Sequence, residues 1–380
     1  MHKGPWRRAH AHITLPILFI LSSICGSLAR TSLTRLTSYK GSPNGGVVWA
    51  NFTGCFIMGL MNSTDLQLFA NIISSHRTIA TPNKYFDSKG AIPLFIAITT
   101  GFCGSLTSFS SFISAIFLSS ANLNPVDVGA LGQPNINNPP NPAYGIMTGL
   151  SVLLTQLLIG LAGFSGGEQL STLIYGDKSD LNPGRISTFL RFSPNGYYIT
   201  ERFLSVVSIC LYIVMIVLSA TVPKSRFWTL QSVFAPLGTF SRFYFSKKFN
   251  NRYTKYPFMG TFLANILATI LLSVLLLLQR GKSSNAAISP SLVQHVVSCQ
   301  VLDALINGFC GCFSTISTFF LEIHKLFRKQ TRKSLVAGYC YGLGTIILGY
   351  VLMVIILGSF AWSRNGLNRP SCYMPGSATR

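Results

Sequence analysis

Two short stretches of the chain carry small and hydroxyl side chains inside long apolar runs. Residues 101–112 read GFCGSLTSFSSF and residues 308–319 read GFCGCFSTISTF, and without gaps they agree at six of twelve positions, where average composition gives roughly one. Glycine and consecutive Ser or Thr weaken a helix, and lipid cannot satisfy the backbone groups that a break releases. The repeat therefore predicts two broken helices whose freed polar groups face protein, water or an ion.

The other polar groups inside the apolar runs are mainly neutral hydrogen-bond donors. They include the amides and hydroxyls of Asn51, Asn265, Ser108, Thr315, Thr148 and Thr345. Such donors can replace the water around a small anion, and the positive edge of an aromatic ring adds a weak further contact. The rings in the repeats that suit this role are Phe109, Phe112 and Phe319. Helix packing is the alternative, because Asn, Ser and Thr also join helices. The register of two asparagines with a duplicated break favours the anion.

Few charged residues fall inside the apolar runs. Arg30 and Arg242 lie at matching positions, where they either draw anions toward a vestibule or make a structural hydrogen bond or reach the interface. Asp303 and Glu322 lie toward segment ends, which indicates interfacial or helix-packing roles. No Cys/His set has zinc spacing and no nucleophile constellation is evident, so neither a side-chain metal site nor an enzyme is expected.

Composition indicates the class of protein that holds these groups. Of 380 residues, 49% are hydrophobic and 10% are charged, which indicates a polytopic membrane protein. The net charge of +21 is explained by basic cytoplasmic loops, so no nucleic acid is expected as a partner. The first 29 residues resemble a secretory signal. However, the GSLAR of residues 26–30 recurs as GTFSR at residues 238–242, so we expect this segment to be retained as a span.

Runs of about 20 apolar residues predict an all-α fold with nine transmembrane helices. These lie near residues 13–33, 45–62, 91–119, 144–164, 203–222, 227–245, 257–279, 300–323 and 336–360. Spans one to four and six to nine carry the same landmarks in the same order: Arg30 with Arg242, Asn51 with Asn265, the broken third helices, and Tyr144-Gly145 with Tyr341-Gly342. They are two four-helix repeats, and the single linker helix between them inverts the second.

Charge placement gives the expected orientation and domains. With the N-terminus in the cytoplasm, the inner segments carry nineteen basic residues and the outer segments nine, as membrane proteins prefer. We expect an extracellular C-terminus and four regions: the first repeat at residues 1–164, a polar cytoplasmic loop and the linker helix at 165–226, the inverted repeat at 227–362, and a polar tail at 363–380. The 165–202 stretch is expected to be a loosely ordered loop.

Taken together, the Asn51 stretch NFTGCFIMG, the two GFCG stretches and the G-x-x-x-R pairs resemble the fluoride channels, namely the bacterial Fluc proteins and the fused eukaryotic fluoride export (FEX) proteins. The resemblance covers all eight repeat spans and the linker helix. It implies antiparallel repeats and fluoride tracks that pass Asn51, Asn265 and paired phenylalanines. It also implies a structural Na⁺ on the backbone carbonyls of Gly104, Thr107, Gly311 and Ser314.

The sequence departs from that pattern in one half. Ile316 stands where the resemblance implies a phenylalanine, and the fourth-span polar residues differ between the repeats. If each pore takes one ring from each repeat, then Phe109 with Phe319 is complete and Phe112 with Ile316 is defective. We therefore expect a plasma-membrane channel that exports fluoride down its electrochemical gradient through one functional pore. It would act as a single-chain pseudo-dimer in the lipid bilayer without an organic cofactor. An inverted-repeat carrier for a small anion or solute is the alternative, and a scaffold that has lost conduction is a third reading.

Overall fold

A computed structural model of the chain describes residues 5–37, 46–63, 68–69, 72–73, 86, 88–121, 123, 141, 143–175, 193–250, 252, 258–281, 292–293, 295–363 and 367. Within these ranges the fold is all helical, and two isolated bridges are the only β-type pairings. The long unbroken helices are α1 (Pro5–Thr37), α2 (Val47–Asn62), α6 (Ala143–Tyr175), α8 (Pro194–Thr221), α9 (Arg226–Phe249), α10 (Met259–Arg280) and α14 (Arg332–Met353). Helix α14 continues through a π-helical turn, η6 (Val354–Gly358), into α15 (Ser359–Ser363).

Two further helices are broken, as the repeated glycine stretches predict. The first consists of α3 (Pro93–Ile96), η2 (Ala97–Cys103) and α4 (Gly104–Leu106), followed after two extended residues by α5 (Phe109–Ser120). The second consists of α11 (Val296–Ala304), η5 (Leu305–Cys310) and α12 (Gly311–Phe313), followed by α13 (Ser317–Phe327). Both η2 and η5 are π-helical, which the sequence pattern did not predict. In each half, a π-helical segment with i→i+5 backbone hydrogen bonds therefore precedes the break.

Seven helical stretches in the described part of the chain are long and apolar enough to cross a membrane. Helix α2 has only 16 residues. Helix α9 is not among the seven; it carries Arg242 in its middle and Lys247 and Lys248 in its last turn. The structure therefore supports a multi-span helical membrane protein, while a count of nine depends on these two helices.

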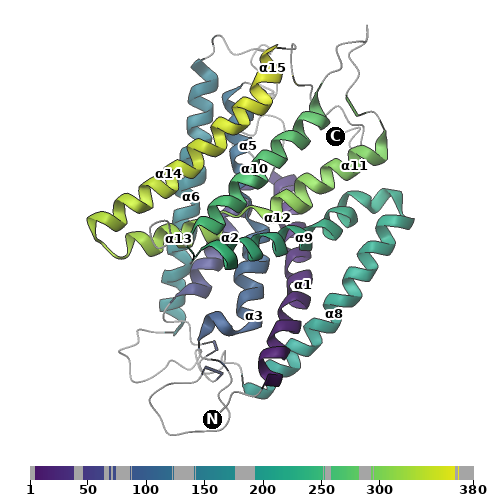
Figure 1. Cartoon of the computed structure of the whole chain (residues 1–380), viewed down its shortest axis with the longest axis vertical. Coiled ribbons are helices and arrows are strands. Elements are labelled where there is room, and N and C mark those ends of the chain that lie inside the picture. Colours follow the sequence, from purple (N-terminus) through teal and green to yellow (C-terminus); the bar gives the residue numbers. More distant parts are fainter. Residues whose placement is uncertain are drawn as a thin grey trace.

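The helices pack around the two breaks. Helix α2 packs against α6, α1 packs against α9, and α9 packs against η5 and α12. Figure 1 shows α9, α10 and α12 meeting near the middle of the molecule, while α8 lies along one edge beside α1. The largest apolar cluster contains Phe109, Phe112 and Phe319, which belong to the second parts of the two broken helices. The breaks therefore lie in the core of the bundle.

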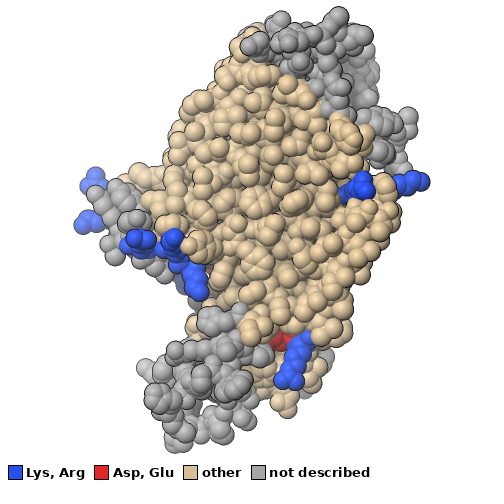
Figure 2. All heavy atoms as spheres, turned by 45° about the vertical axis from the view of Figure 1, so that its right-hand side comes forward, with Lys and Arg blue, Asp and Glu red and all other residues tan. Residues whose placement is uncertain are grey.

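The linker helix α8 is peripheral. Only 6% of the residues in its most apolar 18-residue stretch are buried. Most of its side chains therefore face outward, as expected for a lipid-facing helix. One polar residue fixes it to α1: the Ser208 hydroxyl accepts the Leu21 N–H at 3.1 Å and donates to the Ile17 carbonyl. Figure 2 shows the described Lys and Arg side chains at the margins of a broad uncharged surface.

The stretch at residues 165–202, which was expected to be a loosely ordered loop, is helical at both of its ends. Helix α6 continues to Tyr175 and α8 begins at Pro194, where the Ser193 hydroxyl caps it by accepting the Gly196 N–H at 3.1 Å. The polar composition of these two helix ends led to the wrong prediction. Residues 176–192, most of residues 121–143 and nearly all of the tail after residue 363 lie outside the described residues.

Candidate functional site

Each predicted asparagine lies against the break of its own half. The Asn51 Oδ1 accepts the backbone N–H of Ser108 at 3.0 Å, and the Asn265 Oδ1 accepts that of Thr315 at 2.8 Å. Both asparagines are almost fully buried. The Asn265 amide also donates to the Thr315 carbonyl at 3.1 Å. The asparagines therefore satisfy backbone groups that the breaks release.

Hydroxyl groups cap the breaks across the two halves. The Thr107 hydroxyl accepts the N–H groups of Ile316 and Ser317 at 3.2 and 3.1 Å, at the start of α13. In the mirrored arrangement, the Ser314 hydroxyl accepts the Ser110 N–H at 3.1 Å, in the first turn of α5. A side-chain oxygen at this position does what an N-cap residue does, but the oxygen comes from the other half of the chain. Neither half completes its broken helix alone.

The hydroxyls of Ser108 and Thr315 make local caps. The Ser108 hydroxyl accepts the Ser111 N–H at 3.2 Å, and the Thr315 hydroxyl lies 3.4 Å from the Thr318 N–H. Both residues were predicted to offer their hydroxyls to an anion. In the structure these oxygens accept hydrogen bonds from backbone N–H groups. The hydroxyl hydrogen would therefore be the group that donates to an ion.

The two arginines of the predicted vestibule are buried against carbonyl groups of the breaks. The Arg30 Nη1 donates to the carbonyls of Gly311 and Ser105, each at 2.6 Å, and its Nη2 donates to that of Asn307. Arg30 therefore reaches from the first half to the break of the second. Of the roles that the sequence left open, the geometry is that of the structural hydrogen bond.

Arg242 repeats this arrangement in the opposite direction. Its guanidinium donates to the carbonyls of Gly104 at 2.6 Å and Thr100 at 2.5 Å, and to that of Ser314 at 3.2 Å. A Cβ added to Gly104 would lie 2.4 Å from the Arg242 Nη2. The glycine at this position leaves the space into which the guanidinium fits, and the same holds for Gly311 and Arg30 at 2.3 Å.

The carbonyls of this crossed arrangement match the ligand type of the expected Na⁺. Neutral backbone oxygens suit a hard cation, and each carbonyl has two lone pairs. The carbonyls of Gly104, Gly311 and Ser314 each accept an arginine N–H, which leaves a second lone pair available. The donor chemistry therefore fits Na⁺. The two buried guanidinium groups place positive charge beside these carbonyls. This charge would repel Na⁺ and lower its affinity for the carbonyls.

Three of the predicted phenylalanines form one buried group. The ring centroids of Phe109 and Phe319 are 5.6 Å apart, and those of Phe109 and Phe112 are 6.0 Å apart. A Cβ added to Gly349 would lie 3.3 Å from the Phe109 ring, so this ring packs closely against the Gly349 backbone. The corresponding position of the other half is Val152, whose side chain is fully buried. The two fourth spans therefore differ at this position, with a glycine in the second half and a valine in the first.

Glu322 is a buried residue that joins three parts of the second half. It is 3% exposed, and its carboxylate accepts hydrogen bonds from the hydroxyls of Thr261 at 2.6 Å and Tyr341 at 2.7 Å, and from the Asn250 amide at 3.3 Å. The Tyr341 ring lies 5.3 Å from that of Phe319. Of the two roles expected from the sequence, interfacial or helix-packing, the structure shows the helix-packing one, because this side chain of α13 bonds to residues of α10 and α14. The hydroxyls at positions 261 and 341, which face one helix, were the available signal.

The two threonines predicted for the fourth spans have different environments. Thr345 is fully buried and donates to the Tyr341 carbonyl at 2.5 Å. Thr148 lies on the exposed face of α6 and donates to the Tyr144 carbonyl, so the structure does not bring it to the break. Gln156, which the sequence analysis did not select, points inward instead and accepts the Asn51 amide at 3.0 Å. The Asn51 amide thus donates to a side chain of its own half.

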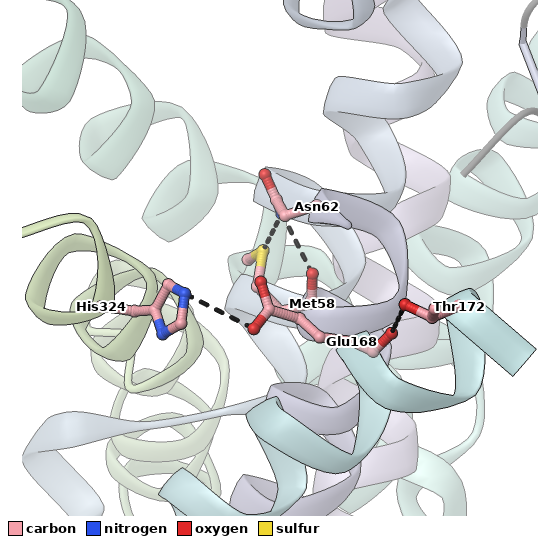
Figure 3. A network of polar contacts seen from close by, with 5 residues as sticks. All are labelled: Met58, Asn62, Glu168, Thr172 and His324. Atoms are coloured by element: carbon pink, nitrogen blue, oxygen red, sulfur yellow. Dashed lines mark hydrogen bonds and ion pairs between the residues drawn. The ribbon is translucent and has the colours of Figure 1, made fainter. Parts of the chain in front are cut away.

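A set of polar contacts lies on α2, α6 and α13, and one of them, between Glu168 and His324, joins α6 to α13 (Figure 3). The His324 Nε2 and the Glu168 Oε2 are 3.4 Å apart, and the Glu168 carbonyl accepts the Thr172 hydroxyl. Nearby, the Asn62 amide donates to the Met58 carbonyl at 3.1 Å. Glu168, Thr172 and His324 border a cavity of about 470 Å³. The contact between Glu168 and His324 connects the first half with the second at the end to which the charge pattern assigns the cytoplasm.

Comparison with known proteins gives the class of protein to which this arrangement belongs. The family described as "CrcB-like protein, Camphor Resistance (CrcB)" matches residues 17–164 and again residues 229–358. The chain therefore belongs to this family, and it carries the family's unit twice.

Two fungal relatives match over most of the chain, and a bacterial relative matches over a quarter of it. Fluoride export protein 1 of Candida albicans is 36% identical over 347 residues, which cover 90% of this chain and 78% of that protein. Fluoride export protein 1 of Saccharomyces cerevisiae is 33% identical, covering 93% and 94%. Fluoride-specific ion channel FluC 1 of Staphylococcus aureus is 34% identical over 96 residues, which cover 25% of this chain and 63% of that protein. No solved structure matches the chain.

Proposed function

We propose that this protein is a fluoride-selective channel that exports fluoride from the cytoplasm down its electrochemical gradient. The relatives named as fluoride export proteins and as a fluoride-specific ion channel support this function. The structural observation that carries it is the duplicated break, at which buried amides and aromatic rings meet and the two asparagines bond to amide and backbone groups and not to a carboxylate in the described part of the chain. Export needs no coupling, because an inside-negative potential drives an anion outward by about 2.3 kcal/mol per 100 mV.

The second half provides the conducting route in this proposal. The route passes the paired rings of Phe109 and Phe319, the amide of Asn265 and the buried Thr345. Three differences support this choice: the ring pair is complete, Gly349 allows the Phe109 ring to pack against α14, and the corresponding positions of the first half are less suited. There Thr148 faces outward, the buried Val152 stands in place of Gly349, and Ile316 replaces a ring.

Glu322 positions the wall of this route. Its carboxylate holds the hydroxyls of Thr261 and Tyr341, and the Tyr341 ring lies against Phe319. An ionised carboxylate would repel an anion at close range, and hydrogen bonds from three donors spread that charge. In this proposal Glu322 fixes the aromatic wall, while neutral donors meet the ion.

A structural Na⁺ forms part of the proposal. When bound by the carbonyls of Gly104, Thr107, Gly311 and Ser314, it would add a bond between the halves beside the two arginines. An ion that binds only the folded protein stabilises it by RT ln(1 + [Na⁺]/Kd). Replacing Na⁺ with N-methylglucamine should therefore lower the melting temperature. An unchanged melting temperature would assign the whole cationic role to the guanidinium groups.

The topology is proposed from charge and family boundaries. We place the chain in the plasma membrane with nine spans, a cytoplasmic N-terminus and an extracellular C-terminus. The repeats at 1–164 and 227–362, separated by the loop and linker helix at 165–226 and followed by the tail at 363–380, agree with the two family matches at 17–164 and 229–358. The protein would act as a single-chain pseudo-dimer.

Replacing each asparagine with aspartate tests which half conducts. The substitution keeps an oxygen to accept the backbone N–H of the break but removes the amide donor and adds a negative charge. Expressed in cells that lack their own fluoride export, Asn265→Asp should abolish growth in fluoride, and Asn51→Asp should leave most of it. Equal membrane levels of both variants are the required control. The reverse pattern would move the route to the first half, and full tolerance in both would exclude the asparagines from conduction.

A further inference from the structure

Three cations surround a cavity at the end of the second broken helix. Lys325, Arg328 and Lys329, together with Phe258 and Leu326, border a cavity of about 360 Å³. The three basic side chains are exposed, and their spacing of three and four places them on one side of a helix end. No acidic residue is among the described residues that border this cavity. It is therefore a site of concentrated positive potential.

The cavity lies next to the aromatic wall of the proposed route. The Phe258 ring is 6.0 Å from that of Tyr341, and the Tyr341 ring is 5.3 Å from that of Phe319. Figure 1 shows α13 running to the left margin of the molecule, where the chain turns into α14. Lys and Arg side chains gather at that margin in Figure 2. A chain of ring contacts therefore leads from the basic cavity to Phe319.

We propose that this cavity, which we call the basic mouth, is the cytoplasmic collecting site for small inorganic anions. The proposal rests on the proposed function, because it adds the place at which fluoride leaves the cytoplasm. A cleft with one sign of charge raises the local concentration of a counter-ion and its rate of association by about ten-fold or more, in a salt-dependent way. Arg30 and Arg242 do not serve this purpose, since their guanidinium groups are buried on carbonyls. Lys325, Arg328 and Lys329 take that role at the surface.

Two structural roles compete with this assignment. Cations in the last turn of a helix are favourable beside its carbonyl end, and basic residues gather on the cytoplasmic side of any membrane protein. Arg328 also borders the neighbouring cavity, where Glu168 and His324 meet. These roles predict effects on stability or orientation. They do not predict that the rate of anion transport depends on the basic mouth at low salt and loses that dependence at high salt.

The chain offers a matched control for this distinction. Lys247, Arg332 and Lys333 are exposed and lie on the same predicted side of the membrane. They do not border the basic mouth. Replacing either set of three with glutamine removes the same charge, so the two triple variants change the topological charge balance equally. A difference in fluoride efflux between the two triple variants therefore depends on where the lost charge lies and not on how much charge is lost.

The experiment measures initial fluoride efflux from liposomes at about 0.02 M and about 1 M salt, where the screening length falls from about 20 Å to about 3 Å. We expect the Lys325→Gln, Arg328→Gln, Lys329→Gln variant to lose about three- to ten-fold at low salt and to equal the wild type at high salt. The control variant should follow the wild type at both. A wild-type rate in the first variant, or an equal loss at both salt concentrations, would overturn the basic mouth. Absence of fluoride efflux from the wild type would contradict the proposed function instead.

Discussion

The substitution Gly311→Ala tests the crossed arginine arrangement. Gly311 has helical dihedral angles, with φ −64° and ψ −31°, so alanine fits the backbone at this position. The added Cβ would lie 2.3 Å from the Arg30 Nη2 and 2.8 Å from the Nη1. Both terminal nitrogens must therefore move. Glycine is needed here because of the guanidinium, and not because of an unusual backbone conformation.

The magnitude follows from the bonds that Arg30 would lose. Its bonds to the carbonyls of Gly311 and Asn307 hold it to the second half, and a bond to a charged donor contributes about 1.5–3 kcal/mol. Losing both bonds costs about 3–6 kcal/mol, which is a large fraction of the free energy of unfolding of a typical protein, roughly 5–15 kcal/mol. We expect the variant to unfold well below the wild-type temperature in detergent and to lose fluoride tolerance.

A double-mutant cycle with Arg30→Ala refines the test. Because Arg30→Ala removes the group that the new methyl would hit, adding Gly311→Ala to it should cost less than about 1 kcal/mol. Gly344→Ala is the control, since no atom lies within 4 Å of its added Cβ, and it should be neutral or slightly stabilising. Additive losses in the cycle would refute the reasoning, because they would show that the glycine serves something other than the guanidinium.

The other predictions concern the ring pair, a cross-half cap and the topology. In a fluoride growth assay with matched expression, Phe109→Ile and Phe319→Ile should each impair export because a branched aliphatic has no positive ring edge. Phe112→Ile should be nearly silent, and equal harm from Phe112→Ile would refute the single route. Thr107→Val should cost about 1–2 kcal/mol in thermal unfolding, since it removes the oxygen that caps α13; an unchanged transition would exclude the cap. Asn62 begins a formal Asn-Ser-Thr acceptor but should carry no glycan on the cytoplasmic side. A glycan there, or a C-terminal tag inaccessible from outside intact cells, would invert the topology.

Sequence reasoning located the breaks because their signal is local. A repeated run of glycine and hydroxyl residues inside apolar sequence violates the pattern of a spanning helix, so the chain itself shows where it must break. Asn51 and Asn265 lie at matching positions relative to these runs, and this register predicted a shared role for the two asparagines. The structure places both side chains on the breaks. Their role in handling an anion stays a prediction.

The partners across the two halves could not be predicted in this way. Arg30 and Thr107 act on the break of the second half, and nothing in the local sequence states which half a side chain will reach. The same limit explains the fourth spans. Thr148 and Thr345 follow the same Tyr-Gly landmark, yet one faces outward and the other inward, because packing and not spacing sets the rotation of each helix. For Glu322 the sequence left an interfacial and a helix-packing role open for a related reason, since linear position does not show what covers a helix end.

Fluoride efflux from liposomes that contain the purified protein tests the central claim most directly. The vesicles are loaded with fluoride, a potassium gradient with an ionophore sets the voltage, and an electrode follows fluoride outside. We predict efflux that rises with a potential negative inside, that needs no proton or sodium gradient, and that does not occur for chloride under the same conditions. Efflux that requires a coupling gradient would indicate a carrier, and no efflux from well-folded protein would contradict transport altogether.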